Sequence, residues 1–312
     1  MEVGGIQALR RWRARQSGRV GLVPTMGALH SGHQALMTRA RAESDLVVTS
    51  IFVNPLQFGA DEDFVQYPRP IASDLAKCEE AGVDFVFAPA LGEMYPSAPE
   101  VRVVAGRMGA VFEGEARPGH FDGVLTVVAK LFNLIKPDVT VFGLKDIQQF
   151  CLVKRMIADL DFDIEIIGLP VVRDADGLAM SSRNEYLSPS DRERALAIPR
   201  ALDAAAEVAA GGAREGAASG GADSGEAREG AASGEAVVES VADGVLPEAI
   251  ESAARAVLES AAERGELDII YLSLVDASTL RPCPADFRGS ALLLVSATVG
   301  GTHLIDNLPL EF

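Results

Sequence analysis

Two histidines that could act on a phosphate group stand between a short apolar run and a helical pattern. They form the sequence H-x-G-H at residues 30–33, directly after Pro-Thr-Met-Gly. Ser31 and Gln34 have the spacing of a capping box, which predicts a helix that begins with Ser31 as its N-cap. Backbone N–H groups at a helix start attract phosphate, and Gly32 would let the ligand approach closely. This stretch therefore predicts an anion site.

The side chains of His30 and His33 could donate hydrogen bonds to phosphate oxygens as negative charge builds in a transition state. A purely structural interpretation also exists, in which one imidazole caps the helix and the other packs on the sheet. The position of the pair, directly after a strand and after Pro-Thr-Met-Gly, favours the phosphate role.

Two further segments place cationic side chains at turns. Lys145 follows an apolar strand-like run and Gly143, where an ammonium group could meet a triphosphate. The alternative is a surface lysine beside an N-cap aspartate, Asp146. The loop at residues 176–184 contains two serine hydroxyls followed by the guanidinium of Arg183. These donors suit an anion that shifts position between the ground state and the transition state. The alternative there is a polar loop with a helix cap.

Two weaker signals consist of uncharged polar residues where strands or loops should open onto the ligand edge of a sheet. They are Asn-Pro-Leu-Gln-Phe-Gly at residues 54–59 and Arg-Pro-Gly-His-Phe-Asp-Gly-Val at residues 117–124. Neither segment assigns a function by itself.

The first 175 residues or so alternate short β-rich runs with helical stretches. Such alternation predicts an α/β fold with a mostly parallel sheet covered on both faces, whose ligands collect at the carboxyl ends of the strands. Predicted strands are 19–23, 46–53, 84–88, 139–142 and 164–168, and predicted helices are 34–43, 73–81, 124–135 and 147–160.

The remainder reads as a smaller α+β domain, so we expect domains at 1–180 and 181–312. Its predicted helices are 189–210 and 247–264, and its predicted strands are 267–275, 291–299 and 302–305. Between the helices, residues 211–236 carry the octad Ala-Arg-Glu-Gly-Ala-Ala-Ser-Gly twice. Small residues without an apolar face cannot offset the entropy of ordering, which predicts a disordered low-complexity insert.

Composition narrows the range of partners. The formal net charge is −17, whereas a protein that grips nucleic acid needs clustered Lys and Arg, so we expect no nucleic-acid partner. No apolar run approaches a membrane span, and the start of the chain lacks the apolar core of a signal peptide. The three cysteines lie far apart, which fits a reduced compartment. We therefore expect a cytoplasmic protein without a membrane partner.

Taken together, these segments resemble the pantothenate synthetase family. The resemblance covers residues 20–188 in order and spacing, through PTMGALHSGH, NPLQFG, YPR, RPGHFDGV, KLFNLIKPD, FGLKDIQQ and DGLAMSSRN. It implies a Rossmann-like N-terminal domain, a smaller C-terminal domain and a homodimer. It also implies ATP-dependent condensation of pantoate with β-alanine through a pantoyl adenylate, with Mg²⁺ as cofactor and AMP and pyrophosphate as products.

The resemblance also implies roles for individual residues. His33, His30, Lys145 and Arg183 would be catalytic, and Gln57 and Gln149 would bind pantoate. The ATP site would comprise Met26, Gly27, Ala28, Leu29, His30, Ser31, Gly32, His33, Gly143, Leu144, Lys145, Asp146, Val172, Met180, Ser181, Ser182 and Arg183. 

Some positions are left without a role. The metal ligands are unknown, with Asp74 a weak candidate and the ATP phosphates an alternative. His303 stands where the family usually has arginine, and both it and His120 stay unassigned. Two rivals remain: a nucleotidyltransferase or tRNA synthetase relative that shares H-x-G-H, and a nucleotide-binding module without catalysis.

Overall fold

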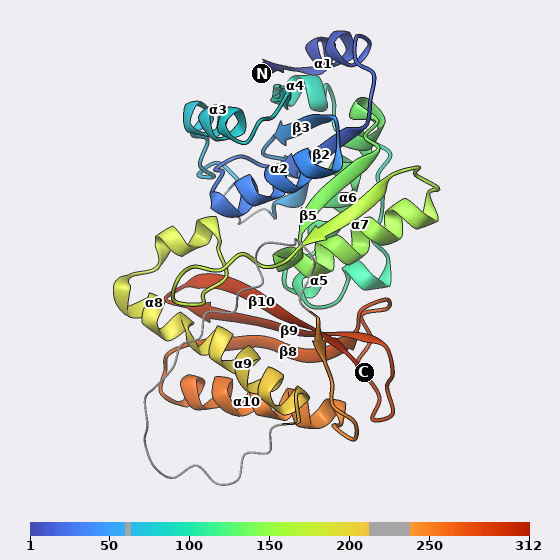
Figure 1. Cartoon of the computed structure of the whole chain (residues 1–312). Helices are drawn as coiled ribbons and strands as arrows, with labels where there is room; N and C mark the ends of the chain where they lie inside the picture. The colour runs from blue at the N-terminus through green and yellow to red at the C-terminus, as the bar shows by residue number, and fades with distance from the viewer. Residues whose placement is uncertain (60–63, 212–237) are drawn as a thin grey trace. The chain divides into compact units, whose positions relative to one another are not determined.

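The computed structural model describes residues 1–59, 64–211 and 238–312. The chain divides into two compact units, Met1–Leu169 and Pro170–Phe312 (Figure 1). Residues 170–180 thus group with the second unit, whereas the sequence-based boundary placed them with the first. The predicted insert at 211–236 lies, apart from Gly211, outside the described residues. In the described ranges, no helix combines the length and the apolar character that crossing a membrane requires.

The first unit is built on a six-stranded sheet of order β1-β4-β3-β2-β5-β6 in which every neighbouring pair is parallel. Its strands are β1 Glu2–Gly4, β2 Val20–Thr25, β3 Leu46–Ile51, β4 Phe85–Phe87, β5 Val139–Gly143 and β6 Glu165–Leu169. Its helices are α1 Ile6–Arg13, α2 Ser31–Glu43, α3 Ile71–Glu80, α4 Leu91–Met94, α5 Glu113–Ala116, α6 His120–Ile135 and α7 Ile147–Asp159, with 3-10 turns η1 Pro55–Gln57, η2 Arg107–Gly109 and η3 Leu144–Asp146.

Helices cover both faces of this sheet, as the strand–helix alternation predicts. One apolar core joins α1, α6 and α7 to side chains such as Leu22 and Phe85. A second core joins α2 and α3 to the opposite side chains of the strands, such as Val23 and Val86. The predicted parallel α/β fold is therefore confirmed, and each strand and helix predicted in this part has a counterpart. Strand β1 and helix α1 were not predicted.

The second unit contains a four-stranded sheet of order β7-β10-β9-β8. Figure 1 shows α9 and α10 on the same side of its long strands, where they share one apolar core with the sheet. Its strands are β7 Glu239–Ser240, β8 Asp268–Asp276, β9 Ser290–Val299 and β10 Thr302–Glu311, and its helices are α8 Pro189–Ala195, α9 Ala197–Ala209 and α10 Pro247–Glu263, with the 3-10 turn η4 Ser182–Tyr186.

Two predictions in this unit are wrong in detail, and both concern segments that contain a proline. The single helix predicted over 189–210 breaks between α8 and α9, because Pro199 cannot donate the hydrogen bond that would continue one helix into the next. Strand β10 continues past its predicted end at residue 305, through Pro309. A proline is tolerated there because β7 pairs with β10 only from Leu310 onward, so Pro309 has a strand partner on one side only.

Candidate active site

The turns after β2 and β5 meet at the centre of the parallel sheet. These strands are neighbours, with Gly21 opposite Val139, although β3 and β4 come between them in the sequence. Strand order reverses at this point, since β3 and β4 extend to one side and β6 to the other. Ligands of open parallel sheets bind at such switch points, beyond the carboxyl ends of the strands. The fold therefore brings the predicted H-x-G-H and Gly-Leu-Lys-Asp segments together.

Helix α2 begins with a cap made by histidines. Its N-cap is His30, not the predicted Ser31, and the His30 Nδ1 atom accepts from the Gly32 N–H at 3.2 Å. The His33 Nδ1 atom in turn accepts from the His30 N–H at 3.3 Å. The interpretation in which a histidine caps this helix is thus correct for His30. It is compatible with phosphate binding, because each cap uses only one ring nitrogen.

The two caps decide which nitrogen carries hydrogen on each ring. An Nδ1 atom that accepts a hydrogen bond holds no proton, so the Nε2 atoms of His30 and His33 are the donors in the neutral rings. Burial, and then the neighbouring His30, lower the pKa of His33 to about 3. His33 is therefore neutral at physiological pH and presents one Nε2–H donor.

The turn between β2 and α2 is anchored by α3. The buried carboxylate of Asp74 accepts from the Ala28 N–H at 2.9 Å and from the Leu29 N–H at 2.8 Å, and Lys77 donates to the Leu29 carbonyl. Gly27 has φ +89° and Ala28 has φ +50°, so the turn runs through left-handed backbone that an external anchor must hold. Asp74 thus shapes the loop that precedes His30.

This arrangement bears on the candidate metal ligand. Both carboxylate oxygens of Asp74 are engaged by backbone N–H groups, which argues for the anchoring role and against coordination of Mg²⁺. Within the described ranges, no group of three or more His, Cys, Asp or Glu side chains could hold a metal ion.

The second cationic segment lies close to His33. Lys145 and Asp146 belong to η3, and both act electrostatically on the His33 ring. The Lys145 Nζ atom lies 3.9 Å from the nearer Asp146 carboxylate oxygen, a long ion pair, and the lysine side chain is mostly buried. A positive charge, a neutral donor and a helix start therefore converge beyond β2 and β5, which is what a phosphate requires.

The amide of Gln57 is held from several sides. Asn54 donates to its Oε1 atom at 3.0 Å, and Tyr95 donates to the Asn54 Oδ1 atom at 3.0 Å. The Gln57 Nε2 atom points to the sulfur of Met26 at 3.1 Å, which joins the Asn-Pro-Leu-Gln-Phe-Gly segment to the turn after β2. Sulfur is a weak acceptor, so this amide could exchange it for a substrate oxygen. Asn54 belongs to the segment at 54–59 that the sequence marked as a weak signal, whereas Tyr95 is a functional candidate that sequence reasoning missed.

Two adjacent glutamines on α7 have different environments. Gln148 is buried and structural, since its amide donates to the carbonyls of Met108 and Val111 and accepts from the Glu113 N–H. Gln149, the predicted pantoate ligand, is half-buried. No described contact joins Gln149 to Gln57.

The remaining predicted nucleotide-binding residues lie together in the second unit. A bridge between Arg173 and Ala179 closes a small hairpin, and the Met180 N–H donates to the Val172 carbonyl at 2.9 Å. Ser181 then caps η4 by accepting from the Arg183 N–H at 3.2 Å. The hairpin thus brings Val172 beside the Met-Ser-Ser-Arg loop. The hairpin is held in place by a bidentate ion pair between Arg173 and the buried Asp306.

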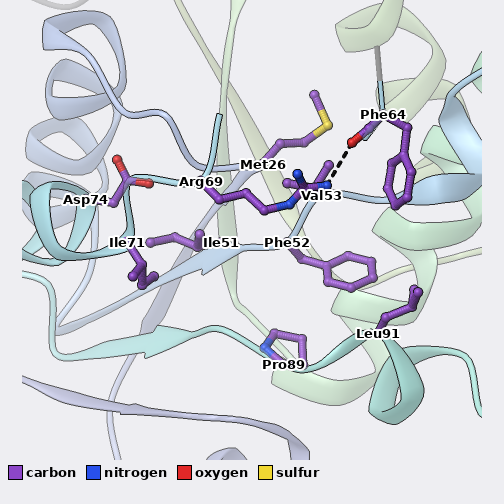
Figure 2. A pocket seen from close by; sticks show the side chains of 10 residues that line it. All are labelled: Met26, Ile51, Phe52, Val53, Phe64, Arg69, Ile71, Asp74, Pro89 and Leu91. Atoms are coloured by element: carbon purple, nitrogen blue, oxygen red, sulfur yellow. Dashed lines mark hydrogen bonds between the residues drawn. The ribbon is translucent and has the colours of Figure 1, made fainter. Parts of the chain in front are cut away.

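A cavity of about 380 Å³ lies in the first unit, next to the anchored turn (Figure 2). It is mostly apolar and receives Met26 and Asp74 from the site, and the Arg69 side chain reaches across it to donate to the Phe64 carbonyl at 2.8 Å. Its lining residues are Met26, Ile51, Phe52, Val53, Phe64, Arg69, Ile71, Asp74, Pro89 and Leu91. Sequence reasoning missed this cavity, because its apolar side chains come from separate segments.

Comparison with known proteins identifies the family. The profile of the Pantoate-beta-alanine ligase family matches residues 3–309. The chain is 49% identical over 309 residues to a pantothenate synthetase of Acidothermus cellulolyticus, covering 98% of this chain and 90% of that protein. It is 48% identical over 312 residues to a pantothenate synthetase of Thermobifida fusca, covering 98% and 93%.

The chain belongs to the pantoate–β-alanine ligase family.

Solved structures agree. The pantothenate synthetase of Thermus thermophilus is 42% identical, with a TM-score of 0.82 and coverage of 99% of both chains. The pantoate–β-alanine ligase of Francisella tularensis, solved in a complex with β,γ-ATP and β-alanine, is 28% identical, with a TM-score of 0.71 and coverage of 99% and 97%. The predicted family is confirmed, and with it an enzyme of the ligase class. The tRNA synthetase and non-catalytic alternatives are set aside.

Proposed function

We propose that this protein joins the carboxylate of pantoate to the amine of β-alanine at the expense of ATP. In the first step a pantoate carboxylate oxygen attacks the α-phosphorus and pyrophosphate leaves, giving pantoyl adenylate. In the second step the β-alanine amine attacks the acyl carbon and AMP leaves, giving pantothenate. The family match along nearly the whole chain carries the proposal, and the donors that converge after β2 and β5 support it.

The proposed roles rest on the family resemblance and fit the chemistry of each group. His33 and His30 donate from Nε2 to phosphate oxygens, and Lys145 and Arg183 neutralise the charge that develops on pyrophosphate. Gln57 and Gln149 hold pantoate. Residues 26–33 and 143–146, with Val172, Met180, Ser181 and Ser182, bind ATP.

A metal ion has a limited place in this proposal. Mg²⁺ bound to ATP would neutralise phosphate charge and orient the polyphosphate. We propose phosphate oxygens and water as its ligands, because Mg²⁺ dehydrates reluctantly and binds nucleotides through their phosphates.

The assembly and the location are proposed on the resemblance. We propose a homodimer that acts in the cytoplasm. Light scattering during size-exclusion chromatography tests the dimer, which requires twice the mass of one chain. The mass of a single chain at working concentration would refute it.

The experiment that tests the proposed function is exchange of labelled pyrophosphate into ATP, with β-alanine left out. Exchange that needs pantoate is expected, because adenylate formation is reversible. Adding β-alanine should then release AMP and pantothenate. Lack of exchange in protein that still binds ATP would refute the assignment of pantoate as the acid.

A further inference from the structure

His120 is a histidine near the proposed pantoate site for which sequence reasoning found no role. It is the first residue of α6, and its Nδ1 atom lies 2.8 Å from the main-chain carbonyl oxygen of Gln57. A carbonyl oxygen can only accept a hydrogen bond, so Nδ1 carries the hydrogen. The imidazole also packs against the buried Phe121 ring in an edge-to-face arrangement, with 4.9 Å between the ring centroids.

Arg117 fixes the same tautomer from the other side of the ring. Its Nη1 atom lies 3.2 Å from the His120 Nε2 atom, and its Nη2 atom lies 3.4 Å from the Gln57 carbonyl oxygen. A guanidinium can only donate, so Nε2 must accept and cannot carry hydrogen. The neutral Nδ1–H imidazole is the one form that satisfies both contacts. Arg117 and His120 therefore hold one carbonyl oxygen together.

This carbonyl belongs to the residue whose side chain faces the proposed substrate. Asn54, which orients the Gln57 amide, also donates to the Gly123 carbonyl of α6 at 3.1 Å. A Cβ atom at Gly123 would lie 2.1 Å from the Leu56 carbonyl oxygen, so the first turn of α6 sits directly on η1. The start of α6 thus contacts the Gln57 main chain directly through His120 and supports the Gln57 side chain indirectly through Asn54.

We propose that His120, kept in its Nδ1–H tautomer by Arg117, is a positioning residue that fixes the Gln57 main chain and thereby aims the Gln57 amide at the acid substrate. The proposal rests on the proposed function, because it assigns pantoate to Gln57. Beyond the proposed function, it requires that the His120 Nδ1 atom, and not Nε2, donates a hydrogen bond to the Gln57 carbonyl oxygen. Loss of the Nδ1 donor should weaken pantoate binding and leave ATP binding unchanged.

Two substitutions separate the ring nitrogens. The amide nitrogen of asparagine can take the place of Nδ1, whereas that of glutamine reaches the place of Nε2. We expect His120→Asn to keep the KM for pantoate within about twofold, and His120→Gln and His120→Ala to raise it about tenfold, the size of one lost hydrogen bond. The KM for ATP should stay constant in pyrophosphate exchange. Glu115→Gln, an exposed neighbour on α5, is the matched control.

The outcomes are decisive. An unchanged pantoate KM in His120→Gln and His120→Ala would overturn the proposal, as would equal increases in the KM values of pantoate and ATP. Nitrogen-15 NMR of the wild-type ring provides a readout independent of activity, and an Nε2–H tautomer at neutral pH would also overturn it. Absence of pantoate-dependent exchange in the wild-type protein would instead refute the proposed function, and the NMR result would still stand.

Discussion

At the scale of single residues, the proposed phosphate donor His33 has a strongly lowered pKa. Its Nδ1 atom is used by the His30 N–H, so the ring can offer a phosphate only its Nε2–H. A cationic imidazole would be a stronger donor, but burial and the neighbouring His30 make that form costly. In the proposed mechanism, the phosphate therefore meets a neutral, pre-oriented donor beside the ammonium group of Lys145.

Removal of this donor should slow adenylation. We expect His33→Ala to lower kcat for pantoate-dependent pyrophosphate exchange by about 10²–10³-fold, the usual effect of losing one donor to a developing charge. His33→Gln should retain more activity, since its amide can place N–H near the position of Nε2. Equal losses in both variants would contradict a role for the Nε2 donor.

The lowered pKa of His33 also links stability to pH. The pKa is about 3 in the folded protein and 6.5 in the unfolded chain, so the unfolded state binds more protons between these values. The stabilisation is fully present above pH 6.5 and is lost as pH falls toward 3. Urea unfolding from pH 7 to pH 4 should therefore show a steeper loss of stability in the wild type than in His33→Gln. Parallel curves would show that His33 titrates normally when folded.

At the scale of elements, the loops of the proposed site are held by hydrogen bonds to helices that are distant from them in the sequence. Helix α3 anchors the turn between β2 and α2, and the start of α6 supports η1. In both cases a buried polar contact joins segments that are far apart in the sequence. Changes at these anchors should act on substrate binding without touching a substrate.

The anchor on α3 can be tested at Asp74. Asp74→Asn keeps the shape but replaces one acceptor oxygen with a donor that faces a backbone N–H. We expect a loss of about 1.5–3 kcal/mol in the free energy of unfolding, measured in urea, and a raised KM for ATP. Glu79→Gln, exposed on the same helix, is the control and should change neither. Unchanged stability in Asp74→Asn would show that the turn holds itself.

The close packing of α6 against η1 can be tested by substitution of Gly123. An alanine Cβ there would lie 2.1 Å from the Leu56 carbonyl oxygen, too close without movement of the backbone. We expect Gly123→Ala to lower the free energy of unfolding by about 1–3 kcal/mol and to raise the KM for pantoate. Gly92→Ala is the matched control, because a Cβ at Gly92 meets nothing within 4 Å. Tolerance of alanine at Gly123 without either effect would contradict the close contact.

At the scale of the whole molecule, the negative net charge of the protein opposes the approach of the proposed substrates, which are themselves anions. The formal net charge of −17 repels anions such as ATP and pantoate at long range, whereas the proposed site offers local positive charge from Lys145 and Arg183. Raising the ionic strength from about 10 mM to about 150 mM shortens the screening length from about 30 Å to about 8 Å. We expect the KM for ATP to fall roughly two- to threefold over this range. A rising KM would show that the local cations dominate instead.

The sequence alone determined the parallel α/β architecture and the two segments at its switch point. Apolar runs of strand length, separated by helical periods, admit few other arrangements, and the Pro-Thr-Met-Gly and His-x-Gly-His residues follow directly on one such run. Short elements such as β1 were not predicted, because three residues carry almost no periodicity and only pairing with β4 gives them a shape.

Tertiary structure decided how the site residues are used. His30 is the N-cap because its imidazole Nδ1 atom accepts a hydrogen bond from the Gly32 N–H. Ser31 is therefore the first residue of the helix. Asp74 became an anchor, and His120 met the Gln57 carbonyl, through contacts between segments that are distant in the chain. Residue types fix which groups can donate or accept, but only the packing of distant segments selects the partner and therefore the tautomer and the role.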